Sequence, residues 1–294
     1  MTDNLEADFR LVQDEKTATR FLANSSIEVI ADFLPAAPPT HALFDFDGTL
    51  SLIREGWPDI MVTMMVEFLQ AAQTDESREV LREVCSKFVM ELTGKQTIYQ
   101  MIRLMEEIAL RGGSPLDPGE YKKEYHNRLM QHIELRRSGL RSGATSPAEL
   151  VVRGSAALLG LLRDRGVELY LASGTDEQYV REEVELLRLD RYFGEHIYGA
   201  QDDYTSFSKA QVIDRILADN VNGADLLGFG DGYVEIQNVR DAGGTAIAVA
   251  SDEANRDGRP DPWKRQRLIG AGANAVVADF AEAAQLLDWL WNSK

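Results

Sequence analysis

The chain of 294 residues contains a single cysteine, Cys85. One cysteine excludes an internal disulfide and a cysteine-based zinc cluster, because both need several thiols. The scarcity of cysteine also favours a reducing compartment. We therefore expect a cytoplasmic protein in which Cys85 packs within a helix, rather than a reactive thiol.

Long hydrophobic runs are absent as well. No segment approaches the roughly 20 apolar residues that span a bilayer, and residues 1–10 are acidic and lack the apolar core of a secretion signal. Hydrophobic residues still make up 44% of the chain and charged residues 27%, which is typical of a soluble globular protein. The composition predicts one large or two modest domains and no membrane partner.

Positive charge is scarce, and the formal net charge is −17. A surface this acidic repels nucleic acids and anionic lipids, so neither is an expected partner. It also repels a phosphorylated small molecule, so a site for such a substrate needs local positive charge from a metal ion or a lysine. The four histidines are scattered, and none has the spacing of metal ligands.

Short apolar segments alternate with helical patterns along most of the chain. The strand-like segments are 41–46, 167–172, 196–199, 225–230, 245–250 and 275–277. Strands that alternate with helices predict an α/β fold with a doubly wound, mostly parallel sheet and right-handed crossovers. From about residue 58 to residue 130 only helical spacing occurs, which predicts an all-helical insertion after the first strand.

These patterns predict three regions. Residues 1–40 form an N-terminal extension, residues 41–55 and 150–294 an α/β catalytic core, and residues 56–149 a helical cap over the carboxyl ends of the strands. Within the extension we expect an amphipathic helix over 11–22, a short strand over 26–30 and a stiff proline-rich linker.

The first strand-like segment ends in Asp45-Phe46-Asp47-Gly48-Thr49. Two carboxylates thus follow a buried strand at the edge where open α/β sheets bind ligands. Crowded carboxylates raise each other's pKa unless a cation offsets them, and a hard cation such as Mg²⁺ prefers oxygen ligands. One carboxylate could then act as a nucleophile and the other as an acid/base. An ordinary strand-ending turn fits Asp45, Asp47 and Gly48 equally well.

Polar residues also follow two later segments. Ser173-Gly174-Thr175 comes after the strand-like segment 167–172 and could bind phosphoryl oxygens, although a helix cap explains it as well. Lys209 opens a predicted helix, where the positive end of the helix dipole disfavours a lysine. It is therefore either a solvated surface lysine or one that pairs with carboxylates or phosphate.

Segment 225–230 runs into Asp231, and Glu235 follows one helical turn later on the same face. Two like charges at that spacing indicate a nearby cation, whereas the alternative is a capping aspartate followed by an ordinary helical glutamate. A doubly wound sheet brings all these strand ends to one edge, where they can bind a metal and position a phosphoryl group.

Taken in order, these segments resemble the motifs of the haloacid dehalogenase-like (HAD) phosphohydrolase superfamily over about residues 41–290. Asp45 to Thr49 is similar to its Asp-x-Asp-Gly-Thr motif, Ser173 to its strand-ending hydroxyl residue, and Lys209 to its helix-opening lysine. Gly230-Asp231 with Glu235 is similar to its acidic motif, except that aspartate is commoner than Glu235. The helical insertion resembles the helical cap of the family.

The resemblance implies an Mg²⁺-dependent phosphohydrolase, a monomer or homodimer, that acts on a small phosphomonoester such as a sugar phosphate or a phosphorylated carboxylic acid. Asp45 would form an aspartyl-phosphate, and Asp47 would protonate the leaving oxygen and then activate water. The implied metal ligands are Asp45, Asp47 and Asp231, with Glu235 as a ligand or an outer anchor. The implied phosphate-binding residues are Ser173, Gly174 and Lys209. The alternatives are a sugar phosphomutase of the same fold and a non-catalytic binding or regulatory protein.

Three residues are candidate substrate contacts in or near the cap. Arg54 and Trp57 closely follow the first motif, although Trp57 fits a packing role equally well. Lys95 lies in Gly94-Lys95-Gln96-Thr97, which is not a P-loop because Val89 stands where the first glycine belongs. As a turn between cap helices, this segment could contact the substrate through Lys95.

Overall fold

The computed structural model describes residues 7–14, 16–72, 74–201, 203, 206–218 and 221–292. Its centre is an eight-stranded sheet in the order β1-β2-β8-β7-β6-β3-β4-β5. The strands are β1 (Thr19–Phe21), β2 (Glu28–Ile30), β3 (His41–Phe44), β4 (Glu168–Asp176), β5 (Ile197–Ala200), β6 (Leu226–Gly230), β7 (Thr245–Val249) and β8 (Ala275–Val277). Strands β3 to β8 pair in parallel, and β1 and β2 add an antiparallel edge. The predicted α/β class and mostly parallel sheet are confirmed.

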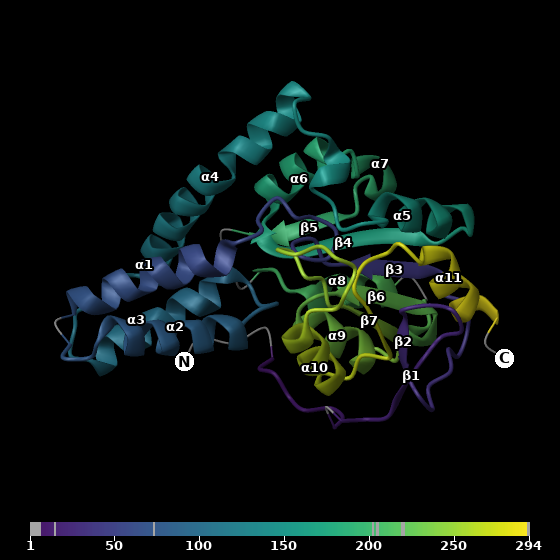
Figure 1. Ribbon diagram of the computed structural model, residues 1–294, viewed down its shortest axis with the longest axis horizontal. Coiled ribbons are helices and arrows are strands. Elements are labelled where there is room, and N and C mark those ends of the chain that lie inside the picture. The colour runs from purple at the N-terminus through teal and green to yellow at the C-terminus, as the bar shows by residue number, and fades with distance from the viewer. Residues whose placement is uncertain are drawn as a thin grey trace.

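Helices cover both faces of the sheet (Figure 1). The helices on one face are α5 (Ser155–Asp164), α6 (Glu177–Leu186), α7 (Asp190–Phe193) and α11 (Ala283–Asn292). The helices on the other face are α8 (Lys209–Ala218), α9 (Tyr233–Asp241) and α10 (Pro262–Gly270). Because strand side chains alternate between faces, Phe44 packs in the first apolar layer and Leu43 in the second. The burial of both faces explains why the parallel strands are apolar throughout.

An all-helical insertion separates β3 from β4, as predicted. Its helices are α1 (Trp57–Ala71), α2 (Arg78–Glu91), α3 (Thr97–Leu110) and α4 (Pro118–Ser142). The longest, α4, begins with a capping box between Asp117 and Glu120 and ends at Gly143, whose φ of 75° suits glycine. Figure 1 shows α1 to α3 beside the sheet and α4 leading back toward α6. Among the described residues, no helix combines the length and the apolar character that crossing a bilayer requires.

The helix that we predicted over residues 11–22 is wrong. The described part of this segment contains no helix: Thr17 N–H donates to the Asp14 carbonyl in a turn, and β1 follows and pairs with β2. Backbone hydrogen bonds hold it to the core, since Val12 N–H donates to the Gly270 carbonyl at 2.8 Å. Because these tertiary bonds satisfy the backbone, a helix over the segment is not needed. The predicted strand over 26–30 is present as β2.

Candidate active site

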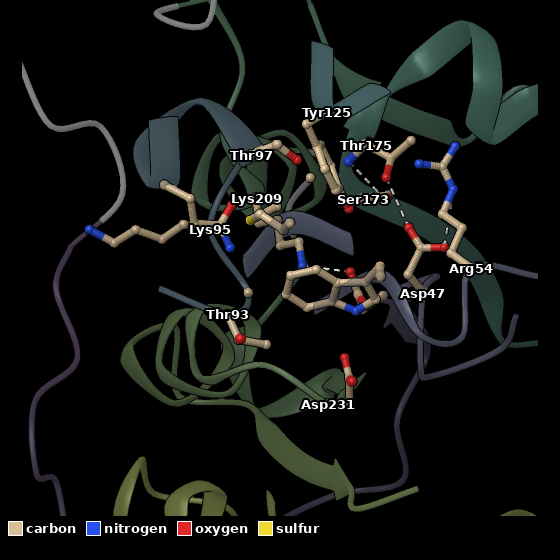
Figure 2. A pocket seen from close by; sticks show the side chains of 16 residues that line it. Asp47, Arg54, Thr93, Lys95, Thr97, Tyr125, Ser173, Thr175, Lys209 and Asp231 are labelled. Carbon is tan, nitrogen blue, oxygen red and sulfur yellow. Dashed lines mark hydrogen bonds and ion pairs between the residues drawn. The ribbon is translucent and has the colours of Figure 1, made fainter. Parts of the chain in front are cut away.

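A pocket opens where β3, β4 and β6 end and the helical insertion faces them (Figure 2). Its open volume is about 90 Å³. The core residues that line it are Asp45, Asp47, Ser173, Gly174, Thr175, Lys209 and Asp231. The other lining residues, which lie in or next to the insertion, are Arg54, Trp57, Met61, Thr93, Gly94, Lys95, Thr97, Gln100 and Tyr125. The structure therefore gathers most of the predicted site residues around one cavity.

Asp45 follows β3 directly and is 6% exposed. Its N–H donates to the Phe229 carbonyl at 2.9 Å, and its Oδ1 accepts a hydrogen bond from Lys209 Nζ at 2.5 Å. Burial raises the pKa of Asp45 well above its usual value; Lys209 opposes this shift, and the neighbouring Glu235 and Asp231 add to it. Lys209 is thus the group that holds charge on Asp45, and it is a buried lysine rather than a solvated one.

Asp47 lies at the edge of the same pocket. Its Oδ2 accepts a hydrogen bond from Thr175 Oγ1 at 2.9 Å, and its buried Oδ1 has no hydrogen-bond partner among the described residues. That oxygen lies 3.6 Å from Arg54 Nε. Burial raises the pKa of Asp47 to about 6, against the opposing effect of Arg54. A carboxyl with this pKa can both give and take a proton near neutral pH.

Gly48 allows the loop after β3 to approach Asp231. Its φ is 75°, and a Cβ at this position would lie 2.2 Å from Asp231 Oδ2. Any side chain would therefore displace Asp231 as well as strain the backbone. The glycine keeps the two acidic segments together.

Three carboxylates could hold a metal ion here. One oxygen from each of Asp45, Asp231 and Glu235 lies within 4.8 Å of the others. Oxygen-only donors with this concentration of negative charge suit a hard divalent cation. Both Glu235 oxygens already accept hydrogen bonds, Oε2 from Lys209 at 2.9 Å and Oε1 from Gly232 N–H at 2.8 Å. This geometry favours Glu235 as an outer anchor over a direct ligand.

The segment from Ser173 to Thr175 belongs to β4, which continues to Asp176. The predicted end of this strand at 172 is therefore wrong, and neither hydroxyl caps the following helix. Ser173 is 1% exposed, and its Oγ accepts a hydrogen bond from Thr175 N–H at 3.1 Å. A Cβ on Gly174 would lie 3.0 Å from the Lys95 carbonyl, so this glycine permits a close approach of the insertion to the core.

Asp231 is not a helix cap either, because α9 begins after Gly232. Instead its Oδ2 accepts a hydrogen bond from Lys264 Nζ at 2.8 Å. Lys264 also donates to Glu253 Oε1 at 2.9 Å and to Ser251 Oγ at 3.2 Å. This cluster was not predicted from the sequence, although Lys264 lies in the first turn of α10, the same unfavourable position that singled out Lys209.

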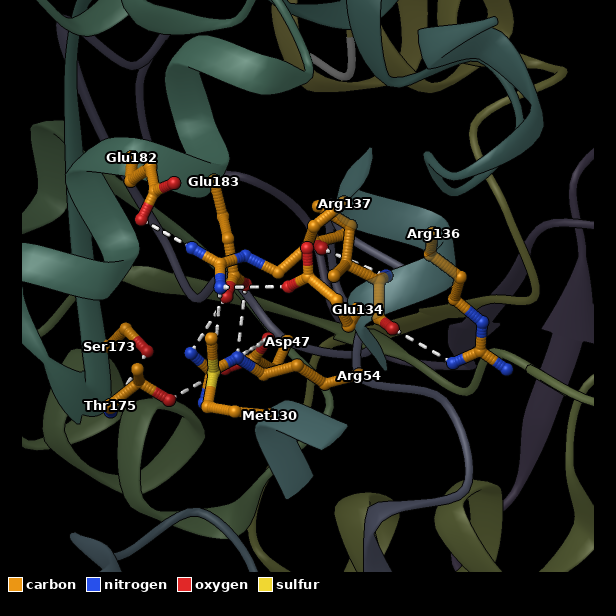
Figure 3. A network of polar contacts seen from close by, with 12 residues as sticks. Asp47, Arg54, Met130, Glu134, Arg136, Arg137, Ser173, Thr175, Glu182 and Glu183 are labelled. Atoms are coloured by element: carbon orange, nitrogen blue, oxygen red, sulfur yellow. Dashed lines mark hydrogen bonds and ion pairs between the residues drawn. The ribbon is translucent and has the colours of Figure 1, made fainter. Parts of the chain in front are cut away.

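Arg54 is held by a buried ion pair (Figure 3). Its Nε and Nη2 donate to Glu183 at 3.0 and 2.9 Å, and Glu183 is fully buried in α6. The two carboxylates beside it, Glu183 and Asp47, outweigh burial and raise the pKa of Arg54. Trp57 combines both predicted roles, since it lines the pocket and packs against the apolar core.

Lys95 lines the pocket with its stem only. Its side chain is 1% exposed, and its Nζ donates to Asp8 Oδ1 at 2.6 Å. Figure 2 shows this side chain leading away from Asp47 and Asp231. The ammonium group therefore meets the N-terminal segment rather than the centre of the site.

Several solved structures are similar to this chain. A predicted phosphoglycolate phosphatase from Haemophilus somnus is 13% identical (TM-score 0.54) and is aligned over 84% of this chain and 97% of its own. A hydrolase from Pseudomonas syringae is 18% identical (TM-score 0.56) and is aligned over 86% of this chain and 100% of its own. A β-phosphoglucomutase from Clostridium difficile is 15% identical (TM-score 0.54) and is aligned over 85% of this chain and 96% of its own. No curated protein has a sequence that matches this chain.

These structures share the fold with this chain at low sequence identity. The sequence signature of haloacid dehalogenase-like hydrolases, by contrast, matches residues 39–243 directly. That range contains the four predicted motifs and the whole helical insertion. The chain belongs to the haloacid dehalogenase-like hydrolase family.

Proposed function

We propose that this enzyme is an Mg²⁺-dependent phosphomonoester hydrolase that works through an aspartyl-phosphate on Asp45. The observation that carries the proposal is the pairing of two carboxylates with different surroundings in one small pocket. Asp45 is bound to Lys209, which opposes the rise of its pKa by burial, whereas Asp47 is bound to the Thr175 hydroxyl, lies 3.6 Å from Arg54 and has a pKa of about 6. A nucleophile must stay ionised and an acid/base must exchange a proton, so the surroundings separate the two roles.

In the first step Asp45 attacks phosphorus. Lys209 holds Oδ1, which leaves Oδ2 as the attacking atom. As the new oxygen–phosphorus bond forms, the bond to the leaving oxygen breaks, and protonated Asp47 gives its proton to that oxygen. In the second step Asp47 takes a proton from water, the water oxygen attacks phosphorus, and the bond to Asp45 breaks. Inorganic phosphate leaves, and both carboxyl groups return to their initial states.

The other lining residues position the phosphoryl group. Ser173 Oγ and the N–H of Gly174 are polar groups at the carboxyl end of β4, and Lys209 adds positive charge on the same side. Asp45, the backbone carbonyl of Asp47 and Asp231 would hold Mg²⁺, with Glu235 anchoring Lys209. When bound, the cation would neutralise charge on the transferring phosphoryl group.

The direct test is hydrolysis of p-nitrophenyl phosphate with and without MgCl₂. We expect phosphate release that requires Mg²⁺ and that Asp45→Asn reduces by about 10³-fold or more, because the nucleophile is lost. Asp164→Asn, an exposed change at the end of α5, is the matched control and should retain activity. Equal activity of Asp45→Asn and the parent would refute the assignment of Asp45 as the nucleophile, and a parent without activity would support a non-catalytic role.

A phosphomutase would use the same aspartate but return the phosphoryl group to the sugar. Product analysis with a sugar phosphate separates the two reactions. Free phosphate as the main product supports hydrolysis, and an isomerised sugar phosphate supports the mutase.

A further inference from the structure

Every cation that lines the pocket is already paired with a carboxylate. Within the described residues these cations are Arg54, Lys95 and Lys209. Arg54 binds Glu183, Lys95 binds Asp8, and Lys209 binds both Asp45 and Glu235. Beyond the phosphoryl-binding groups, the pocket therefore offers a substrate no positive charge that lacks a carboxylate partner.

This pairing disfavours a second anionic group on the substrate. A carboxylate taken from water into a small pocket needs a cation or several donors to replace its hydration. Here it would compete with Glu183 for Arg54 or with Asp8 for Lys95, and Asp47 and Asp231 would repel it. The same cost applies to a second phosphate.

Uncharged polar groups of the insertion face the pocket instead. They are the hydroxyls of Thr97 and Tyr125 and the side-chain amide of Gln100. In the part of the chain that the structure describes, none of the three side chains makes a hydrogen bond to the protein, although Gln100 is only 3% exposed and Tyr125 only 6%. Burial raises the pKa of Tyr125, so its hydroxyl stays a neutral donor. Figure 2 shows Thr97 and Tyr125 on the side of Ser173 and Thr175.

These three side chains line the pocket without a partner among the described protein residues, so a ligand bound there can supply their hydrogen bonds. Hydroxyl groups can both donate and accept, and they match a mixed set of hydroxyls and an amide. Trp57 and Met61 add an apolar wall suited to a carbon chain.

We infer that the substrate is a monophosphate whose leaving part is small, uncharged and hydroxylated, a polyol or sugar phosphate rather than a phosphorylated carboxylic acid or a bisphosphate. The inference rests on the proposed phosphohydrolase function and selects among its substrates. The carboxylate–cation pairs disfavour substrates with a second negative charge. Asp8 contributes from outside the pocket because it binds the ammonium group of Lys95.

The test compares substrates that differ only by a carboxylate. Glycerol 3-phosphate is paired with 3-phosphoglycerate, and 2-hydroxyethyl phosphate with 2-phosphoglycolate. In each pair we expect kcat/KM for the neutral member to be at least about tenfold higher, because the carboxylate finds no unpaired cation. Equal or better turnover of the carboxylated members by an enzyme that hydrolyses p-nitrophenyl phosphate would overturn the inference. If the enzyme hydrolyses p-nitrophenyl phosphate but neither neutral member, the inference fails and the proposed function stands. If it hydrolyses none of these compounds, p-nitrophenyl phosphate included, both fail.

Two variants test the residues that make the selection. Asp8→Asn removes one carboxylate that binds Lys95 and weakens the competition for its ammonium group, so the preference for the neutral members should fall by about threefold or more. Asp14→Asn, an exposed change in the same N-terminal segment, is the control and should leave the preference unchanged. An unchanged preference in Asp8→Asn would contradict the part assigned to the Asp8–Lys95 pair.

Gln100→Leu tests hydroxyl recognition separately. It should lower kcat/KM for glycerol 3-phosphate more than for p-nitrophenyl phosphate, whose leaving group has no aliphatic hydroxyl to bind. An equal loss on both substrates would show a structural role and overturn this part of the inference.

Discussion

At the base of the pocket, two lysines each bind two carboxylates. Lys209 binds Asp45 and Glu235, and Lys264 binds Asp231 and Glu253. The four acids and two lysines leave two negative charges in excess, which is the charge that one divalent cation offsets. Lys264 also reaches the nucleophile loop, because it donates to Ser251, whose hydroxyl donates to the Gly48 carbonyl at 2.5 Å.

Replacing Lys264 with methionine should therefore destabilise the fold and increase its dependence on a cation. Asp231 and Glu253 would be left without their shared partner, and losing charged hydrogen bonds in such a part-buried cluster costs about 1.5–3 kcal/mol. We expect a free energy of unfolding lower by about 1.5–3 kcal/mol in EDTA, measured by urea denaturation. MgCl₂ should raise the Tm of the variant more than that of the parent.

Lys123→Met, an exposed change on α4, is the control for this measurement and should match the parent with and without Mg²⁺. A Lys264→Met variant as stable as the parent in EDTA would show that the cluster contributes nothing to the fold.

The predicted site residues have a local sequence pattern that indicates them, whereas the missed ones depend on contacts between distant parts of the chain. Asp45, Lys209 and Asp231 could be predicted because each follows a strand or opens a helix, which is visible within a few residues of sequence. Lys264 and Glu253 could not, since their role depends on α10 lying beside the loop after β6. Lys95 was predicted to lie near the substrate, but its ammonium group binds Asp8. Because Asp8 is 87 residues away in the sequence, no local pattern indicates this contact.

At the scale of elements, the loop between α2 and α3 joins the insertion to the core. Its Gly94 approaches Gly232, and the Gln96 amide donates to the Phe207 carbonyl at 2.8 Å. These contacts place the loop against the segments that carry Ser173, Lys209 and Asp231. The loop closes the pocket from the side opposite Asp47 (Figure 2).

Gly232→Ala tests this contact. The φ of Gly232 is −103°, which alanine adopts without strain, but its Cβ would lie 2.6 Å from the Gly94 Cα. The loop must move away, so kcat/KM for p-nitrophenyl phosphate should fall by about 10- to 100-fold. Limited proteolysis between α2 and α3 should become faster.

The control is Gly160→Ala in α5, where a Cβ meets nothing within 4 Å. It should keep full activity and gain about 0.5–1 kcal/mol of stability, because alanine is the better helix former. If Gly232→Ala kept the parent's activity and resistance to protease, the close contact would have no part in forming the site.

The boundaries of the elements show which parts of the fold are determined by residues close together in the sequence. The helix predicted from Lys209 is present as α8, Lys209–Ala218, because its apolar periodicity lies within ten residues. Residues 11–22 carry a similar periodicity, yet edge pairing of β1 and contacts with α10 give them a path without a helix in their described part. Strand β4 runs past its apolar part because pairing with β5 continues at Asp176.

At the scale of the whole molecule, charge opposes the proposed reaction. The chain carries a net charge of −17, whereas its substrate would be a phosphate dianion. The paired lysines of the pocket give local attraction only over short distances. The long-range negative field therefore slows the approach of the substrate, and the lysines attract it only once it lies within a few ångströms of the site.

We accordingly expect added salt to lower the KM of this enzyme. Raising NaCl from about 10 mM to about 150 mM shortens the Debye length from roughly 30 Å to 8 Å. Repulsion between the protein and p-nitrophenyl phosphate weakens, so KM should fall by about two- to threefold while kcat stays constant, because the pocket contacts are too short to be screened. MgCl₂ is kept saturating at each salt concentration, and sucrose at equal osmolality serves as the uncharged control. A KM that rises with NaCl would instead indicate that the local positive charge of the pocket governs the approach of the substrate.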